Sequence, residues 1–358
     1  MKKRFIILFF IVMIIIPQMG CKSQNNNVGI EKTSFHLDTI CKITVYSMEG
    51  LEGMSEEEQK KEVLSVITDA FKLCDEYENI LSKTKEGTDI YRINHAGGEA
   101  VEVSEAAIEV IRKGIEYGQL SGGAFDITIG AVTDMWDFHN TDEEGNRIGE
   151  VPDEAALKEA SSHVDYRNII INGNTVRLAD PGAQIDLGGI AKGYIADKVG
   201  EFLEQKGVTG AIVYLGGNIS VVGEKGESLE NSKGTPFEVG IGDPSSETGG
   251  LLGTVSCKDK TVVTSGTYER YFEADGKKYH HVLNPDTGFP VDTDLLSVTV
   301  ISDKGRSQDC DGLSTVCLAL GKAKGMKLIK SIDGVEAVFL DTDNKVSVSS
   351  EDMDFKAN

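Results

Sequence analysis

The sequence is poor in positive charge. Its 36 Lys and Arg residues stand against 58 Asp and Glu residues, which gives a formal net charge of −22. A surface that binds a phosphate backbone needs a basic stripe, and no such stripe is visible, which argues against nucleic acid as a partner. A phosphorylated small molecule stays possible because a bound divalent cation can invert the local field.

Paired cysteines are also missing. Beyond Cys21 the chain has five cysteines, an odd number without a short paired spacing, which argues against a disulfide framework or a zinc site. Cys310 and Cys317 lie seven residues apart in a predicted helix, and we interpret them as small buried apolar side chains on one face of that helix. A catalytic thiol is the alternative.

The longest apolar run, residues 5–16, is too short to span a bilayer as a helix, which takes roughly 20 residues. With the basic residues before it, it predicts a signal peptide over residues 1–20. Cys21 after a small residue resembles the lipobox of bacterial lipoproteins, although Gln18 stands where that motif usually has Leu. We expect an extracytoplasmic protein anchored to the cell membrane by a lipidated Cys21, with plain secretion or a retained anchor as alternatives. Residues 21–33 would form the lipidated N-terminus and a polar tether.

Periodicity and capping signals predict two helices and a hairpin in the first half of the chain. Residues 55–81 open with Ser and three Glu and carry apolar residues at helical spacing. Ser104 is the expected N-cap of a helix that runs toward Gly118. The sequence NGN at 172–174 predicts a hairpin over residues 169–178.

The predicted fold class is α+β: a single large domain of mixed, largely antiparallel sheets with packed helices. It would cover residues 34–350, with a C-terminal tail at 351–358, and no internal repeat stands out. Further predicted elements are strands at 40–46, 183–187, 211–214, 219–222, 237–241, 253–257, 261–265, 268–274 and 296–301, helices at 190–205 and within 305–330, and a closing hairpin at 335–348.

Residues 279–320 hold the most informative pattern, HHVLNPDTGFP followed by DCDGLSTVCLAL. Asp311 and Thr315 lie four residues apart at a predicted helix start, so their oxygens point the same way. Such a pair can hold a hard cation beside a phosphate. The alternative is an N-cap aspartate with a threonine that bonds back to its own helix.

A second pattern, QIDLGGIAKGY at 184–194, predicts a strand, a glycine-rich turn and a helix. Glycines allow close approach of the backbone to a ligand, and a helix N-terminus offers N–H groups to an anion. Lys192 would then neutralise a phosphate or a ring oxygen. An ordinary structural turn with a solvated lysine is the alternative.

Five motifs occur in order: GGAFD at 122–126, DLGGIAKG at 186–193, VTSGTYER at 263–270, the histidine loop at 280–290 and DGLST at 311–315. Together they resemble the ApbE-type FAD:protein FMN transferases over residues 35–340. The resemblance implies an enzyme that binds FAD with Mg²⁺. It would transfer the FMN half, through its phosphate, to a threonine hydroxyl of a partner protein and release AMP.

The resemblance also implies the residues that contact FAD. Leu37 takes the place of a flavin-contacting methionine, and Thr84 takes the place of an aromatic residue that stacks near the flavin, which Thr84 cannot do. The full implied set is Leu37, Thr84, Ala124, Phe125, Asp126, Asp186, Lys192 and His281.

For the metal, the resemblance implies the Gly189 carbonyl with Asp311 and Thr315, an all-oxygen set of the kind that Mg²⁺ requires. The implied catalytic residues are His281 and Asp311. His281 is the first candidate for the general base, with Asp311 or Asp186 as the second. Asn284 replaces the usual aspartate of the histidine motif.

The implied acceptor is a membrane-bound redox subunit with an Asp-Gly-x-Ser/Thr-Gly-Ala-Thr type of motif, of which this chain contains no copy. Two alternatives remain open. Water could replace threonine, which would make the protein an FAD pyrophosphatase. A flavin-binding lipoprotein without catalysis is the other.

Overall fold

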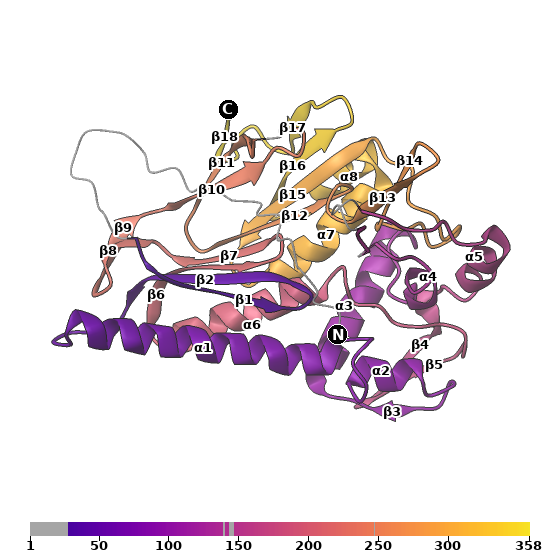
Figure 1. Cartoon of the computed structure of the whole chain (residues 1–358), viewed down its shortest axis with the longest axis horizontal. Helices are drawn as coiled ribbons and strands as arrows, with labels where there is room; N and C mark the ends of the chain where they lie inside the picture. The colour runs from indigo at the N-terminus through magenta and orange to yellow at the C-terminus, as the bar shows by residue number, and fades with distance from the viewer. Residues whose placement is uncertain (1–27, 139, 143–146, 247) are drawn as a thin grey trace.

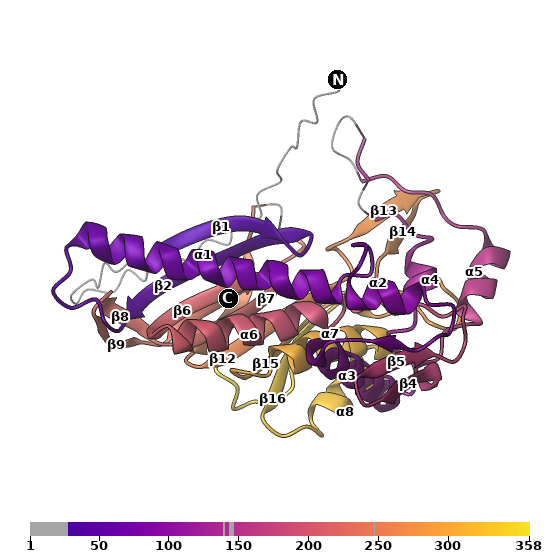
Figure 2. The ribbon, with the colours of Figure 1, turned by 90° about the horizontal axis from the view of Figure 1, so that it is seen from below.

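The computed structural model describes residues 28–138, 140–142, 147–246 and 248–358. The predicted signal peptide and Cys21 lie outside this part of the chain. The architecture is α+β, as predicted, with one large antiparallel sheet between a helical layer and a small second sheet (Figures 1 and 2). The folded part runs from Ile30 to Ala357, which is wider than the predicted 34–350 because the last residues form a strand.

The large sheet has the order β1-β2-β6-β7-β12-β15-β16-β17, and every neighbouring pair is antiparallel. Long-range pairing builds it: Cys41 on β2 is the Cα partner of Leu215 on β6. Its strands are β1 (Ile30–His36), β2 (Thr39–Met48), β6 (Val208–Leu215), β7 (Asn218–Gly223), β12 (Lys260–Gly266), β15 (Leu295–Asp303), β16 (Val335–Asp341) and β17 (Val346–Val348).

Helices cover one face of this sheet, which we call the inner face; Ile43, Val213, Val263 and Val300 point from it into the main apolar core. α1 (Glu56–Leu81) and α6 (Ala191–Gln205) lie side by side there (Figure 2). α7 (Ser307–Leu320) packs on β12 and β15, and α3 (Glu105–Ser121) packs on α7.

The opposite, outer face is covered by a three-stranded sheet of β10 (Phe237–Gly242), β11 (Leu251–Cys257) and β18 (Phe355–Ala357). A second apolar cluster fills the space between the two sheets. Ile219, Val262 and Ile301 of the large sheet belong to it, with Val239 and Val255 of the small one. The central strands of the large sheet are therefore buried on both sides, whereas the edge strand β1 keeps one exposed face.

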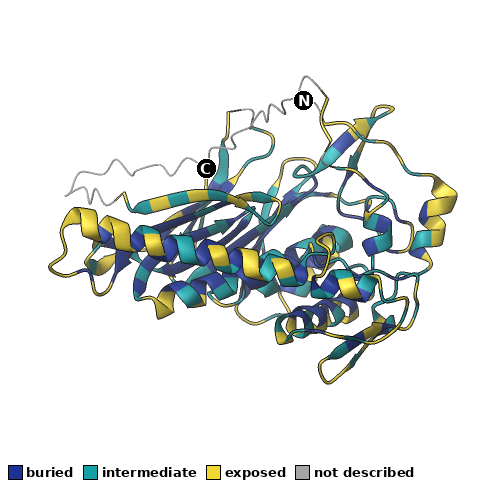
Figure 3. Cartoon of the chain, turned by 60° about the horizontal axis from the view of Figure 1, so that its bottom comes forward, coloured by how far each residue is buried: buried dark blue, intermediate teal, exposed yellow. Residues whose placement is uncertain are grey.

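The predicted helix starts are confirmed. The Ser55 hydroxyl accepts the Glu58 N–H, and the Glu58 carboxylate accepts the Ser55 N–H, which is a complete capping box. Ser104 caps α3, which ends at Gly122 with a left-handed φ of 64°. Figure 3 shows the alternation of exposed and buried residues along α1 that its spacing predicts.

The predicted hairpin is confirmed as β4 (Ile169–Asn172) and β5 (Thr175–Leu178). The strand predicted at 183–187 is wrong, since only Gln184 forms an isolated bridge. The Asn94 side chain bonds both the N–H and the C=O of Ile185 instead, so that a side-chain amide takes the place of a partner strand.

The strand predicted at 268–274 starts late, at β13 (Tyr271–Ala274), because a turn follows Gly266. No helix in the described ranges is long and apolar enough to cross a membrane. The remaining elements are α2 (Asp89–Asn94), β3 (Val101–Glu102), α4 (Gly130–Thr133), α5 (Glu154–Ser161), η1 (Tyr166–Asn168), β8 (Lys225–Ser228), β9 (Asn231–Thr235), β14 (Lys277–His280) and α8 (Lys322–Ile329).

Candidate active site

The segments that carry the predicted site meet at one end of the large sheet. A Cβ atom on Gly216, in the turn between β6 and β7, would lie 2.5 Å from the Thr39 side chain, so this turn packs against the start of β2. The Asp38 carboxylate lies 3.8 Å from the guanidinium of Arg270, just before β13. The tip of the β1–β2 hairpin therefore adjoins the segment that follows β12.

That tip has an unusual backbone. Leu37 and Asp38 form the two-residue turn between the paired His36 and Thr39, with φ values of 54° and 55°. Left-handed conformations at both central positions define a type I′ turn, which normally selects Asn and Gly. A leucine there is strained, and such strain is common at functional sites. The structure thus holds Leu37, a predicted flavin contact, in a fixed and costly conformation.

Two of the predicted metal donors lie next to each other. A Cβ atom on Gly189 would lie 3.7 Å from the Thr315 hydroxyl oxygen and 2.9 Å from the Phe125 ring. Gly189 comes from the turn before α6, Thr315 from α7 and Phe125 from the loop after α3. The fold thus joins three motifs that are far apart in sequence, and the contact with Phe125 leaves little room for any side chain at position 189.

Asp311, the third predicted donor, is only 3% exposed. Its Oδ2 accepts the Gly193 N–H at 2.9 Å, and its Oδ1 lies 3.4 Å from the Asn218 amide nitrogen. Burial raises the pKa of Asp311, and the charge of Lys192 and these two donors oppose that rise. A cation at this carboxylate would favour its ionised form.

Asp311 is not an N-cap, so that alternative is wrong. α7 begins at Ser307, and the Asp197 carboxylate on α6 accepts the N–H groups of Ser307 and Gln308. The second part of that alternative, a threonine that bonds back to its own helix, is confirmed, since the Thr315 hydroxyl donates to the Asp311 carbonyl at 3.4 Å. One turn of helix nevertheless presents both side chains to the Gly189 turn.

The donor set fits Mg²⁺. Within the part of the chain that the structure describes, no group of three or more His, Cys, Asp or Glu side chains could hold a metal ion. Gly189, Asp311 and Thr315 offer a carbonyl, a carboxylate and a hydroxyl, all hard oxygen ligands with a single charge. Phosphate oxygens and water would fill the remaining positions, as is usual for Mg²⁺.

His281 is held as a neutral base. Its Nδ1 lies 3.2 Å from the Arg270 carbonyl, a bond in which Nδ1 must be the donor, so Nε2 is left as the acceptor. Burial and then the charge of Arg270 lower the pKa of His281 to about 3. The neighbouring His280 lies on β14 and pairs with Tyr271.

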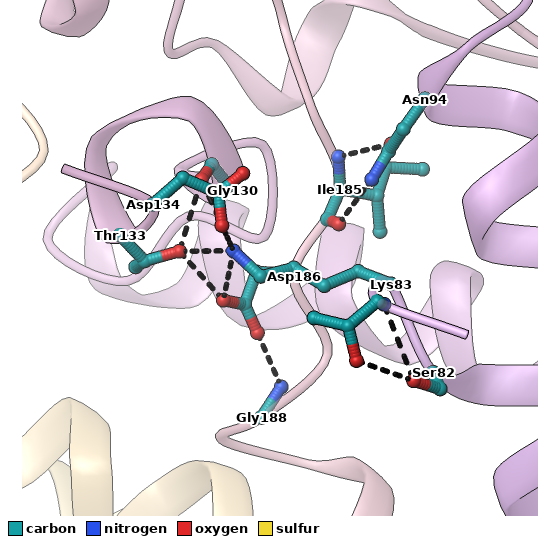
Figure 4. A network of polar contacts seen from close by, with 10 residues as sticks. Ser82, Lys83, Asn94, Gly130, Thr133, Asp134, Ile185, Asp186 and Gly188 are labelled. Carbon is teal, nitrogen blue, oxygen red and sulfur yellow. Dashed lines mark hydrogen bonds and ion pairs between the residues drawn. The ribbon is translucent and has the colours of Figure 1, made fainter. Parts of the chain in front are cut away.

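Asp186 sits in a dense polar network (Figure 4). Its Oδ2 accepts the Thr133 hydroxyl at 2.7 Å and lies 3.1 Å from Lys83 Nζ, while its Oδ1 accepts the Gly188 N–H at 2.8 Å. Burial opposes ionisation, but Lys83 and these donors outweigh it, so the pKa of Asp186 is lowered. Lys83 also contacts the Asp134 carboxylate at 2.7 Å.

This network ties the segment that holds Thr84 to the glycine turn, because Lys83 is the residue before Thr84. The Thr84 N–H donates to the Ser82 hydroxyl at 3.2 Å, and the two hydroxyls lie 3.2 Å apart. The sequence analysis assigned no role to Lys83. Its partners lie 47 to 103 positions away in the chain, and no local pattern signals them.

Asp126 and Lys192 also have internal partners. The Asp126 carboxylate is buried and accepts bonds from Thr128 and from the Tyr166 N–H, which organise the loop that carries Ala124 and Phe125. Lys192 Nζ donates to the Gly188 carbonyl at 3.1 Å. Contact of these residues with FAD remains a prediction.

Glu269, which the sequence analysis quoted only as part of a motif, also belongs to the site. Burial raises its pKa to about 7, while Lys192 and Arg270 oppose the rise and Asp311 adds to it. A Cβ atom on Gly217 would lie 3.8 Å from a Glu269 carboxylate oxygen, which places this carboxylate beside the turn that leads to Asn218, the residue that contacts Asp311. The sequence feature that could have indicated Glu269 is its place as the acidic residue of the motif VTSGTYER.

Known proteins resemble this chain in sequence. Residues 37–339 match the model of the ApbE family. The chain is 35% identical over 328 residues to the FAD:protein FMN transferase of Treponema pallidum, covering 89% of this chain and 86% of that protein. It is 34% identical over 287 residues to one from Klebsiella pneumoniae, covering 78% and 83%.

Solved structures agree in fold. The ApbE protein of Thermotoga maritima superposes with a TM-score of 0.74 at 27% identity, covering 89% of this chain and 96% of that one. The flavin transferase ApbE of Vibrio cholerae gives a TM-score of 0.73 at 24% identity, covering 89% and 96%. The order of the motifs, the meeting of their residues at one sheet end and these matches place the chain in the ApbE family.

Proposed function

We propose that this protein is an FAD:protein FMN transferase, which moves the FMN half of FAD onto a threonine hydroxyl of an acceptor redox protein and releases AMP. The observation that carries the proposal is the convergence of Gly189, Asp311 and Thr315 from the α6 turn and α7. The charge of Lys192, whose Nζ donates to the Gly188 carbonyl, opposes the rise in the pKa of Asp311. The family membership and the names of the two relatives support the same activity.

In the proposed reaction, the threonine oxygen attacks the phosphorus on the FMN side of the pyrophosphate. A new P–O bond forms to threonine, the bridging P–O bond breaks, and AMP leaves with the bridging oxygen. The hydroxyl proton passes to Nε2 of His281, which the bond from Nδ1 to the Arg270 carbonyl leaves free to accept it. The negative pyrophosphate would raise the low pKa of His281 and make it a better base.

Gly189, Asp311 and Thr315 would hold Mg²⁺. When bound, Mg²⁺ withdraws negative charge from the pyrophosphate and steadies the departing AMP. The chain itself orients the site. Gly193 holds the Asp311 carboxylate through its N–H, and Asp186 fixes the glycine turn through the N–H of Gly188. Asp186, paired with Lys83, is a poorer candidate for the base than His281.

One observation favours a second candidate, an FAD pyrophosphatase. Thr84 has no ring to stack on a flavin, and its hydroxyl lies against that of Ser82. Looser closure over the flavin would give water access to the same phosphorus. A non-catalytic flavin carrier has less support, because Asp311 and Thr315 are both in place.

The test incubates the protein with FAD, Mg²⁺ and an acceptor that carries the flavinylation motif, and measures the mass of the acceptor. A gain of one FMN on a threonine supports the transferase, whereas free FMN and AMP without acceptor point to the pyrophosphatase. Absence of both products would refute an enzymatic role. Asp311→Ala should abolish turnover, and Asp303→Ala, which removes an exposed carboxylate, should not. Turnover by Asp311→Ala would refute the metal assignment.

We also propose that the protein is anchored outside the cytoplasm by lipid on Cys21, which would bring it close to a membrane-bound acceptor. Two acyl chains give firm attachment, and one does not. Labelled palmitate should be incorporated into the wild type and not into Cys21→Ser. Absence of label from the wild type would show that lipid on Cys21 is not the anchor.

A further inference from the structure

We propose that Asn218 and Ser265 are positioning residues for the two side chains that would hold the cation, Asp311 and Thr315. The inference rests on the proposed function and adds a layer of polar groups beneath its metal site. Neither residue was singled out from the sequence, and neither is among the predicted donors.

The two residues are neighbours on the inner face of the large sheet. Asn218 begins β7, and its Cα partner on β12 is Val263, two residues before Ser265. Residues two apart on a strand point to the same face, so the side chains of Asn218 and Ser265 lie on one side of adjacent strands. α7 packs directly on β12 at this place.

Asn218 fixes the Asp311 carboxylate from the sheet side. It is 1% exposed, and its Nδ2 lies 3.4 Å from Asp311 Oδ1, while Gly193 donates to Asp311 Oδ2 from the helix side at 2.9 Å. Each carboxylate oxygen therefore faces one donor. The reverse orientation of the amide would set two oxygens against each other.

The other end of the same amide lacks a partner. Asn218 Oδ1 is buried and accepts no hydrogen bond from the described part of the chain. An unsatisfied buried acceptor is unfavourable, so a donor is expected to meet it in the working enzyme. Water bound to Mg²⁺ beside Asp311 is such a donor, because Mg²⁺ usually keeps several waters.

Ser265 has the corresponding positioning role for the Thr315 hydroxyl. Its hydroxyl lies 2.7 Å from that of Ser314 and 3.5 Å from that of Thr315. Within the described residues, the Thr315 hydroxyl has two hydrogen-bond contacts, both long, to Ser265 at 3.5 Å and to the Asp311 carbonyl at 3.4 Å. Its lone pairs are therefore available to a cation, and Ser265 helps to set the direction of the hydroxyl.

Groups that orient metal ligands typically change metal affinity by about 10- to 100-fold when they are removed. We expect Asn218→Leu, which keeps the size and removes both polar ends, to weaken binding of the cation toward the upper end of that range. Ser265→Ala should weaken it about 10-fold, and Ser265→Thr, which keeps the hydroxyl, should restore it.

The structure offers a matched control. Ser220 lies two residues past Asn218 on the same face of β7, is 0% exposed, and its hydroxyl has no partner in the described part of the chain. Within the described residues, its hydroxyl therefore forms no hydrogen bond with Asp311 or Thr315. Ser220→Ala should leave cation affinity within about twofold of wild type, since it removes no group that orients a ligand.

The experiment measures Mn²⁺ bound to the whole protein in the presence of FAD, by the loss of the free Mn²⁺ signal in electron paramagnetic resonance. FAD affinity without metal and the melting temperature without metal are measured for each variant, and both should match wild type for Ser265→Ala. Affinity losses in Asn218→Leu and Ser265→Ala, with recovery in Ser265→Thr, support the proposal.

Equal Mn²⁺ affinity in wild type and both variants would overturn the positioning role and leave the proposed transferase intact. Failure of wild type itself to bind Mn²⁺ with FAD would instead count against the metal site of the proposed function. If Asn218→Leu does not fold, Ser265→Ala and its threonine rescue still decide the matter. A loss in Ser220→Ala as large as in Ser265→Ala would also refute the proposal.

Discussion

The Lys83–Asp186 pair allows a quantitative test of how the glycine turn is held. The two side chains are 16% and 20% exposed, with 3.1 Å between Nζ and Oδ2. Lys83→Met removes the ammonium and leaves Asp186 with the Thr133 hydroxyl and the Gly188 N–H. Removing one partner of a fully buried pair costs about 3–5 kcal/mol, so we expect about 2–3 kcal/mol for this partly exposed one.

Urea unfolding of wild type, Lys83→Met, Asp186→Asn and the double variant would measure this cost and a coupling energy of about 1–2 kcal/mol. The pH dependence follows from the two shifts. The pKa of Asp186 is lowered and that of Lys83 is raised. The pair therefore stabilises the fold fully between the unfolded pKa values, about 3.9 and 10.4. The stabilisation is lost as the pH falls through the folded pKa of Asp186 or rises through that of Lys83.

A control lies two residues away. Lys85 Nζ is 2.7 Å from the Glu78 carboxylate, but Lys85 is 44% exposed, so Lys85→Met should cost no more than about 1 kcal/mol. Equal costs for the two lysine variants, or a Lys83→Met cost that persists unchanged at pH 2.5, would refute the reasoning. Because Lys83 precedes Thr84, we also expect Lys83→Met to weaken FAD binding, measured by flavin fluorescence.

Three further outcomes follow. His281→Ala should slow AMP release in a single turnover by about 10²- to 10⁴-fold, without loss of FAD binding, and a smaller effect would exclude it as the base. Burial raises the pKa of Glu269 to about 7, so Glu269→Gln should stabilise the protein by up to about 3 kcal/mol at pH 8 and by nothing near pH 4. A constant gain in melting temperature would contradict this sign. A Cβ atom on Gly193 would lie 2.3 Å from the Ser307 carbonyl oxygen, so Gly193→Ala should cost about 3 kcal/mol in urea unfolding. Gly242→Ala, which meets no atom within 4 Å, serves as its control.

Helices and strands could be predicted where the residues that specify them lie close together in the chain. The capping box at Ser55 and the N-cap at Ser104 depend on residues three positions apart, and both appear in the structure. The strand predicted at 183–187 failed because its apolar pattern could not reveal that Asn94 bonds the backbone of Ile185. A hydrogen-bond partner about ninety positions away in the chain produces no pattern within a window of ten residues.

The candidate site likewise has one part that local sequence could predict and one part that it could not. Asp311 and Thr315 could be predicted because helical spacing already places them together. Their orientation by Asn218 and Ser265 could not be predicted, because it arises only when β7 and β12 pair beneath α7. The motif order indicated which segments meet, and only the fold shows which atoms hold them.

The pairing of β2 with β6 has a consequence for how the chain must be made. Cys41 finds its partner Leu215 only after more than half of the chain has been synthesised. Until then the β1–β2 hairpin lacks its neighbour in the sheet and has only α1 to pack against among the elements that precede α2. Closure of so long a loop also makes folding slow. N-terminal fragments that end before β6 therefore lack the strand that joins the β1–β2 hairpin to the rest of the large sheet, and the growing chain can complete this pairing only after β6 has emerged.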